Sequence, residues 1–304
     1  MVKKVTTLLY FLYYLYYLVL IPLVSKFVDP LIVYELNGRK IKLPISHRLP
    51  FYIHLNELYS QNVGRIGKII RSKYKNLSAI EVGANVGDTI IIMRSFSKYP
   101  ILGIEGDSRF FKILAENTKY ERDVFIENYF LSDKEEETRL EFRGGFGTGG
   151  LTEGKNNIMV RTLDSLLEDR AQFINAKYLI TDTDGFDFNV LRGAINFIKR
   201  SKPVIFFEFD PDFILENKQK PKGIFEYLSI IGYVFYIVYD NLGDLIFSFD
   251  INKDKGYFRL LRYFYKKNNR YYGDIVAFNK VDKDLFEKVL MDEDNFYNKN
   301  KNYK

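Results

Sequence analysis

The sequence predicts an α/β fold in which a mostly parallel sheet is covered by helices on both faces. From residue 77 onwards, short runs rich in β-branched and aromatic residues alternate with segments of helical periodicity, and the connections are short. This alternation is typical of βαβ crossovers, which place parallel strands in a covered sheet. The chain has 304 residues, of which 47% are apolar, so one large domain can form a core without disulfides.

Four segments are expected along the chain. Residues 1–30 form a hydrophobic N-terminal helix, residues 31–76 a hairpin and helical cap, residues 77–291 the main domain, and residues 292–304 a flexible tail rich in Asn and Lys. Residues 5–25 carry no charge over about the length of a membrane-spanning helix, but five tyrosines interrupt them. The alternatives are a helix packed on its own domain or a partner, an interfacial anchor, or a true span. We expect a cytoplasmic protein, with membrane association through residues 5–25 as an option.

The elements follow from local patterns. Residues 31–43 contain two apolar runs around Asn37-Gly38, a strong hairpin signal, and residues 51–71 have helical spacing. Strands are expected at residues 77–83, 101–105, 124–131, 178–182, 204–209, 233–239 and 273–279. Helices are expected at residues 88–97, 109–117, 188–199 and 223–231.

Composition excludes several kinds of site. The chain contains no cysteine, so disulfides, Cys-ligated zinc, iron–sulfur clusters and a thiol nucleophile are ruled out. The net charge of +6 arises from 45 basic and 39 acidic residues that are interleaved, which does not favour nucleic acid as a partner.

A glycine loop follows the first strand of the main domain. The sequence IEVGANVGDT at residues 80–89 lacks the G-x-G-x-x-G spacing of dinucleotide-binding folds. It fits instead an acid-x-G-x-[G or N]-x-G pattern, in which Asn85 can adopt the left-handed conformation that otherwise favours glycine. Glu81 would repel a pyrophosphate but suits a cationic ligand, and S-adenosylmethionine carries a sulfonium and an ammonium without phosphate. The expected cofactor-binding residues of this loop are Glu81, Gly83, Ala84, Asn85, Gly87 and Asp88.

Two further acidic positions follow successive strands. Glu105 lies about 20 residues after the glycine loop, where an acid hydrogen-bonds ribose hydroxyls in nucleotide-binding sheets. Ser132 and Asp133 follow the third strand, where Asp133 could accept from an adenine amino group. Each acid alone could be a solvated loop residue or a helix cap, but three at successive strand ends favour a cofactor site.

The ordered motifs resemble the FkbM-type family of class I S-adenosylmethionine-dependent methyltransferases. The resemblance covers roughly residues 77–210 and includes IEVGANVGDT, IEGD, LSD, VRTLDSL, YLITDTDGFDFNVLRGA and PVIFFEFD. It implies a Rossmann-like sheet of seven strands, the last antiparallel, and O-methylation of hydroxyls on sugars or secondary metabolites. The fourth strand of the family usually ends in Lys-x-Asp-x-Glu-Gly, whereas this chain has TDTDG at residues 181–185. Thr181 replaces the lysine and Asp184 the glutamate.

The catalytic groups are expected among these acids. We expect Asp182 beside the donor methyl group and Glu208 orienting the acceptor, with Asp184 as either a catalytic group or a helix N-cap. A divalent cation held by these three carboxylates is an alternative that we do not favour, so no metal site is assigned. His47 is a candidate general base, ahead of His54.

Two other stretches are less specific. GGFGTGG at residues 144–150 is not followed by the Lys-Ser/Thr pair of a P-loop and is expected to be a mobile loop or hairpin beside the acceptor pocket. The aromatic residues at 233–239 and 263–272 are expected in the core rather than in stacking platforms.

Three functions remain open at this point. The first is an O-methyltransferase that acts on a sugar, a glycolipid or another small hydroxylated acceptor, with a small-molecule or glycan partner and no nucleic acid. The second is a binding protein that keeps the fold without turnover, and the third is a nucleic-acid methyltransferase. The acceptor and the oligomeric state stay open.

Overall fold

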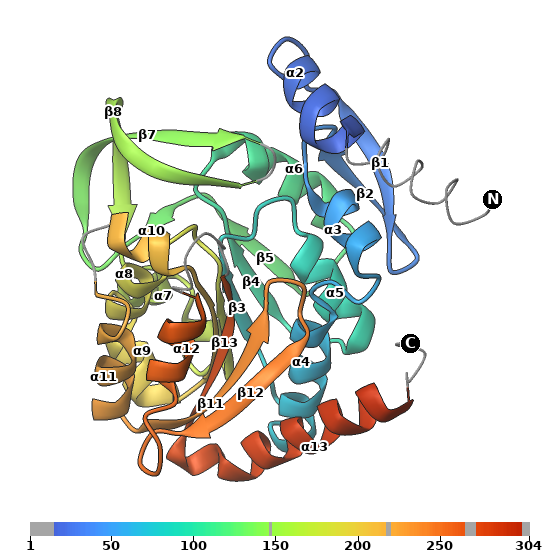
Figure 1. The fold of residues 1–304 in the computed structure, drawn as a ribbon. Coiled ribbons are helices and arrows are strands. Elements are labelled where there is room, and N and C mark those ends of the chain that lie inside the picture. The colour runs from blue at the N-terminus through green and yellow to red at the C-terminus, as the bar shows by residue number, and fades with distance from the viewer. Residues whose placement is uncertain (1–14, 146–147, 217–219, 265–271, 300–304) are drawn as a thin grey trace, which may run out of the picture.

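The computed structural model describes residues 15–145, 148–216, 220–264 and 272–299 and contains a central sheet of eight strands (Figure 1). The strand order is β12-β11-β13-β10-β9-β3-β4-β5. The bounds are β3 Ala79–Val82, β4 Ile101–Ile104, β5 Val124–Glu127, β9 Tyr178–Thr181, β10 Val204–Phe209, β11 Tyr233–Asp240, β12 Leu245–Asp250 and β13 Gly273–Asn279.

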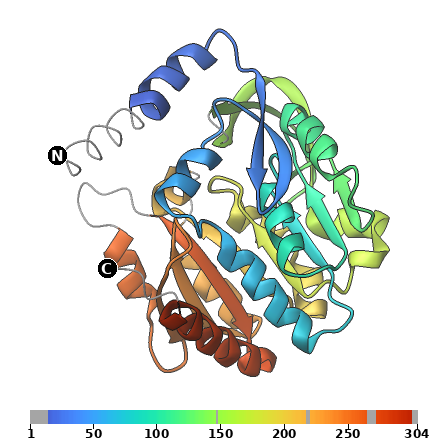
Figure 2. The same ribbon diagram turned by 90° about the vertical axis from the view of Figure 1, so that its right-hand side faces the viewer.

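Helices cover both faces of this sheet, as the alternating sequence predicts (Figures 1 and 2). One face packs against α4 (Gln61–Lys73), α5 (Asp88–Phe96), α6 (Ser108–Thr118) and α13 (Lys283–Lys299). The other face packs against α7 (Leu163–Asp169), α8 (Asp187–Arg192), α9 (Ile195–Ser201), α11 (Gly223–Ile230) and α12 (Tyr257–Phe264). The central strands β3, β4, β9 and β10 are buried along their whole length, which explains why they are continuous apolar runs.

The end of the sheet confirms the expected antiparallel last strand. β13 lies between β10 and β11 and runs antiparallel to both. The sheet has one strand more than the seven expected, because residues 245–250 turn back and pair with β11 at the edge as β12. The aromatic run of β11 is buried, so its expected place in the core is confirmed. The second aromatic stretch falls largely on residues 265–271, which lie outside the described residues.

The N-terminal cap contains the predicted hairpin. β1 (Leu31–Leu36) and β2 (Arg39–Pro44) are joined at Asn37 and Gly38, whose φ angles of 49° and 74° are those of a type I′ turn. The single helix expected at residues 51–71 is instead two helices, α3 (Leu49–Leu55) and α4. The helical conformation is interrupted between them, and Ser60, the residue before α4, has a φ of 56°.

Two other expected elements are divided. The strand expected at residues 124–131 is split into β5 and the short β6 (Phe130–Leu131), which leaves the central sheet and pairs with β8. The helix expected at residues 188–199 is split into α8 and α9 at Gly193, because the chain passes the Ser132 carbonyl so closely that a Cβ would lie 2.0 Å from its oxygen.

A long hairpin projects beside the main sheet. β7 (Glu136–Gly145) and β8 (Thr148–Arg161) pair antiparallel and form a three-stranded sheet with β6. The glycine-rich stretch at residues 144–150 therefore lies at the end of a hairpin, one of its two expected forms. Residues 146–147 lie outside the described residues. The remaining short helices are α10 (Pro211–Glu216), η2 (Ala171–Phe173) and η3 (Lys280–Asp282).

Helices form both described ends of the chain. The flexible tail expected from residue 292 is wrong for residues 292–299, which belong to α13; Glu293 of this helix is buried and bonded to Arg65. At the other end, η1 (Tyr16–Leu20) and α2 (Ile21–Ser25) are described, and most of their large apolar side chains are exposed. Among the described residues, no helix combines the length and the apolar character that a membrane span requires. Residues 1–14 lie outside the described part.

Candidate active site

The loops that follow β3, β4, β9 and β10 meet at one edge of the central sheet. This is where parallel α/β sheets bind ligands, because the strand order reverses there and leaves a crevice. Two adjoining cavities lie at this edge. Both are lined by four residues, Gly83, Asn85, Asp182 and Asp184.

The glycine loop between β3 and α5 has the conformation that the sequence predicts. Gly83, Asn85 and Gly87 have φ angles of 85°, 46° and 87°, so the expected left-handed Asn85 is confirmed. Gly83 lies against β9, where a Cβ would be 1.8 Å from the carbonyl oxygen of Asp182. The backbone N–H groups of Gly83 and Ala84 both donate to the Ile104 carbonyl, which ties the loop to β4.

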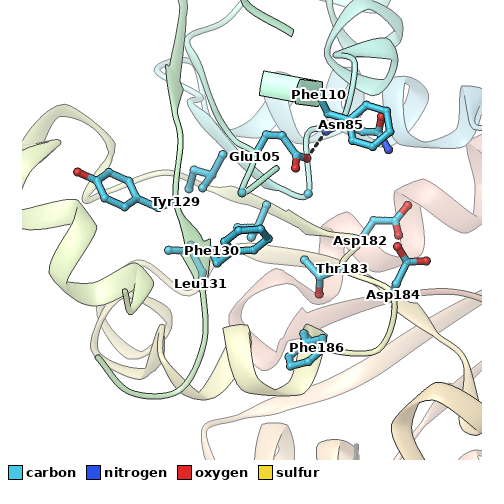
Figure 3. Close-up of a pocket in the computed structure, with 14 residues that line it drawn as sticks. Asn85, Glu105, Phe110, Tyr129, Phe130, Leu131, Asp182, Thr183, Asp184 and Phe186 are labelled. Carbon is cyan, nitrogen blue, oxygen red and sulfur yellow. Dashed lines mark hydrogen bonds between the residues drawn. The ribbon is translucent and has the colours of Figure 1, made fainter. Parts of the chain in front are cut away.

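The first cavity, which we call the Glu105 cavity, encloses about 600 Å³ (Figure 3). Glu105 accepts hydrogen bonds from the backbone N–H of Asn85 at 2.8 Å and of Asp107 at 2.7 Å. Burial raises the pKa of Glu105 to about 7, against the effect of these two bonds. The apolar part of the lining comes from Val82, Ile104, Phe110, Phe130, Leu131 and Phe186.

The second cavity, which we call the carboxyl cavity, encloses about 1030 Å³. Six carboxyl groups line it, namely Glu81, Asp88, Asp182, Asp184, Glu208 and Asp274. Its other polar side chains include His47, Arg48, Tyr52, Tyr59 and Tyr272. Five of the six acids, all except Asp274, are predicted site residues, whereas the predicted Glu105 lines the first cavity.

Burial, and then repulsion by neighbouring acids, raise the pKa values of four of these carboxyl groups, those of Glu81, Asp182, Glu208 and Asp274. Burial is the largest cause for Asp182, whose pKa lies well above its usual range, and Asp184 raises it further. The pKa of Glu208 is likewise far above normal, first from burial and then from Asp182. Burial also raises the pKa of Asp274 to about 8. Oε2 of Glu81 and Oε2 of Glu208 are buried and accept no hydrogen bond from any described residue.

His47 does not have the geometry of the general base that we considered. Its Nδ1 accepts a hydrogen bond from the backbone N–H of Leu49 at 3.2 Å, so the ring proton lies on Nε2 and faces Oδ1 of Asn85 at 3.3 Å. Burial lowers the pKa of His47, which favours the neutral ring. The imidazole therefore supports the glycine loop through Asn85. His54 is exposed and lines neither cavity.

Ser132 and Asp133 do not line either cavity. Asp133 lies 3.4 Å from Nε of Arg192, and the Ser132 hydroxyl accepts from Asn189. The two preceding residues, which form β6, supply the cavity wall instead. The expected contact of Asp133 with an adenine amino group therefore has no support in this geometry.

The altered TDTDG motif has its own local bonding. Asp184 has a φ of 49° and lines both cavities, whereas the N-cap of α8 is Phe186, so the N-cap alternative for Asp184 is wrong. The Thr181 hydroxyl donates to the buried Asp187. The threonine thus donates to Oδ1 of a buried carboxyl group of α8, a contact that the motif alone does not indicate.

Sequence reasoning missed several lining residues. Tyr52, Tyr59 and Tyr272 belong to segments far from the motifs, and Asp274 enters the cavity only because β13 inserts beside β10. Phe110 follows the Glu105 motif directly, and its place on the first turn of α6 is a signal that could have identified it.

The residues present fit S-adenosylmethionine. Apolar walls and a strand-end carboxylate match an adenosine in the Glu105 cavity. Glu81 lines the adjoining carboxyl cavity, and its Oε2, which has no hydrogen-bond partner among the described residues, suits a cationic ligand. No group of three or more His, Cys, Asp or Glu side chains within the described ranges has the geometry to hold a metal ion.

Comparisons with known proteins agree with this architecture. The model of the methyltransferase FkbM domain matches residues 81–235, just over half of the chain. A comparison with curated proteins finds no significant match.

Three solved structures illustrate the structural similarity. The methyltransferase FkbM from Methylobacillus flagellatus is 12% identical, with a TM-score of 0.41. The alignment covers 67% of this chain but only 44% of the Methylobacillus chain. An O-methyltransferase from Bacillus cereus in complex with SAH is 12% identical with a TM-score of 0.38, over 71% of this chain and 80% of that one. The METTL16 MTase domain is 11% identical with a TM-score of 0.45, and the alignment covers 80% of this chain and 73% of that domain.

Proposed function

The chain belongs to the FkbM methyltransferase family, and we propose that it transfers a methyl group from S-adenosylmethionine to a hydroxyl group of a small-molecule or glycan acceptor. One observation carries this proposal. Two cavities of different chemistry, one lined mainly by apolar side chains around Glu105 and one lined by six carboxyl groups, share Gly83, Asn85, Asp182 and Asp184. A donor and an acceptor bound in the two cavities would meet at these residues.

The donor would be held by the Glu105 cavity. Glu105 keeps one lone pair on each oxygen for ribose hydroxyls while its other lone pairs accept from the loop backbone. Phe110 and Phe130 provide apolar surface for an adenine ring. When bound, S-adenosylmethionine would supply a methyl carbon on positively charged sulfur, which the acceptor oxygen would bond as the carbon–sulfur bond breaks and S-adenosylhomocysteine leaves.

Asp182 is the group proposed to take the proton of the acceptor hydroxyl. It lines both cavities, and burial and the neighbouring Asp184 raise its pKa, which makes its ionised form a stronger base than an ordinary aspartate. Glu208 lines only the carboxyl cavity and is proposed to orient the acceptor. Neutral His47 holds Asn85, and so the glycine loop, in place.

The experiment combines binding with turnover. S-adenosylhomocysteine is titrated into the full chain by calorimetry, and transfer of labelled methyl from S-adenosylmethionine is measured over a panel of saccharides and other hydroxylated compounds. Wild-type protein is compared with Asp182→Asn and with Glu168→Gln, an exposed control on α7. Absence of S-adenosylhomocysteine binding would refute the proposal. Binding without transfer to any acceptor would support the alternative of a protein that has lost turnover, and transfer to RNA or DNA would support the nucleic-acid alternative.

A further inference from the structure

Two carboxyl groups of the carboxyl cavity lie directly opposite each other on adjacent strands. Glu208 of β10 and Asp274 of β13 are partners in the antiparallel register, and both side chains line the cavity. Facing residues in such a pair have Cβ atoms about 5 Å apart, and like charges there destabilise a sheet. A pair of ionised acids at this place therefore needs a cation nearby, and without one the raised pKa values of both groups keep them protonated.

The described residues do not provide that compensation. Glu208 is only 9% exposed, and its Oε2 has no hydrogen-bond partner among the described residues. No described Lys or Arg forms an ion pair with Glu208 or Asp274, and every neighbour that shifts the pKa of either group is itself acidic. Arg48 is the one Lys or Arg among the described residues that line this cavity, which six carboxyl groups also line.

Aromatic rings line the same cavity. Tyr52 and Tyr59 stack with their ring centroids 5.0 Å apart, and Tyr272 lines the cavity with them. Burial is the largest cause that raises the pKa of Tyr272, and interactions with Tyr52, Tyr59 and Glu208 raise it further. The negative faces of aromatic rings attract cations, and ammonium groups in particular are recognised by such rings.

We propose that Glu208, Asp274 and these three tyrosines bind a primary ammonium group of the acceptor, so that the acceptor is an amino alcohol or amino sugar. The ammonium donates to the two facing carboxylates, and the acceptor hydroxyl is thereby directed towards Asp182, which lines the same cavity. This inference rests on the proposed function, because it names the class of acceptor for that site.

An ammonium group fits better than the other cations or a neutral sugar. A hard metal ion prefers oxygen ligands in a closed set, and no such set is present among the described residues, whereas aromatic rings are not its ligands. A neutral hydroxyl would leave the two facing acids protonated, whereas a cation stabilises their ionised forms. An ammonium has three N–H donors and a charge that aromatic faces also attract.

The test measures thermal stability in the presence of saturating S-adenosylhomocysteine. Ethanolammonium, which carries both an ammonium and a hydroxyl, is compared with the neutral ethylene glycol and with magnesium chloride, in phosphate buffer at ionic strength matched with NaCl. We expect ethanolammonium at about ten times its Kd to raise Tm by roughly 3 °C above the NaCl control, and ethylene glycol to give no rise. The rise should vanish in the double variant Glu208→Gln/Asp274→Asn and persist in Glu168→Gln.

A second pair of variants examines the aromatic contribution. Tyr272→Phe keeps the ring and should keep the rise in Tm, whereas Tyr272→Leu should reduce it. Equal rises for ethanolammonium and ethylene glycol, a rise that survives the double variant, or a larger rise with magnesium would each overturn the inference. Calorimetry on the same samples separates the two proposals: if S-adenosylhomocysteine binds and ethanolammonium does not, the acceptor class is wrong while the proposed function stands.

Discussion

Replacement of Gly83 by alanine provides a direct test of how the glycine loop is built. The residue has a φ of 85°, and a Cβ would lie 1.8 Å from the carbonyl oxygen of Asp182, whereas real Cβ atoms stay at least about 3.0 Å from such an atom. The loop and the end of β9 would have to move apart by more than 1 Å. That movement would also disturb the bond from the Asp182 N–H to the Val82 carbonyl.

The expected cost has separable contributions. A left-handed conformation costs an alanine about 1–2 kcal/mol, overpacking against backbone costs about 1–3 kcal/mol more, and a weakened backbone hydrogen bond adds up to about 1 kcal/mol. We therefore expect Gly83→Ala to lower the free energy of unfolding by about 3–5 kcal/mol. Gly38→Ala is the matched control, because Gly38 has a φ of 74° and nothing within 4 Å of a Cβ. It should cost only about 1–2 kcal/mol.

Urea denaturation followed by circular dichroism measures both variants against wild type. Calorimetry with S-adenosylhomocysteine should show a loss of at least about tenfold in affinity for Gly83→Ala, since the movement distorts the glycine loop, whose Gly83 and Asn85 line the Glu105 cavity. Gly38→Ala should bind as wild type does. If the free energies of unfolding of the two variants differ by less than about 0.5 kcal/mol, the close approach of Gly83 to β9 does not constrain the loop.

Three further predictions concern single carboxyl groups. Glu293→Gln should lower the free energy of unfolding in urea by about 3 kcal/mol, because it leaves the largely buried Arg65 guanidinium without a charged partner and with an acceptor for only one of its two bonds of 2.7 Å. Glu168→Gln should leave the free energy of unfolding unchanged. Glu105 has a pKa of about 7 in the folded protein against a reference value of 4.5, so the unfolded chain loses this proton at lower pH. Wild-type stability should therefore fall as pH rises from 4.5 to 7. An equally steep fall in Glu105→Gln would contradict this prediction. Asp182→Asn should reduce kcat for methyl transfer by about 10²–10⁴-fold and change S-adenosylhomocysteine affinity little, and a variant that turns over normally would exclude Asp182 as the base.

Much of the fold could be predicted because it depends on neighbouring residues. The alternation of strands and helices, the turn at Asn37-Gly38 and the left-handed Asn85 all express preferences that a few adjacent residues determine. Acids placed after successive strands could also be assigned to one site, since the carboxyl ends of parallel strands lie at the same edge of a sheet.

Other features depended on contacts between distant segments. Helical spacing alone could not show that residues 51–71 break at Ser60 or that α13 continues to Lys299, where Glu293 finds its partner in α4. The role of His47 was misjudged for the same reason. Leu49 and Asn85 determine which ring nitrogen of His47 accepts a hydrogen bond and which one carries the proton, and only folding brings Asn85 next to His47.

The sequence by itself determined the fold class, the glycine loop and the acids that line the proposed donor site. Their physical origins are periodicity and backbone conformation, which are local. Only the tertiary structure decided what faces those acids. Asp274 lies opposite Glu208 because β13 inserts antiparallel beside β10, and tyrosines from both ends of the chain line the same cavity. Such pairings depend on the free energy of the whole packed molecule, which no short stretch of sequence contains.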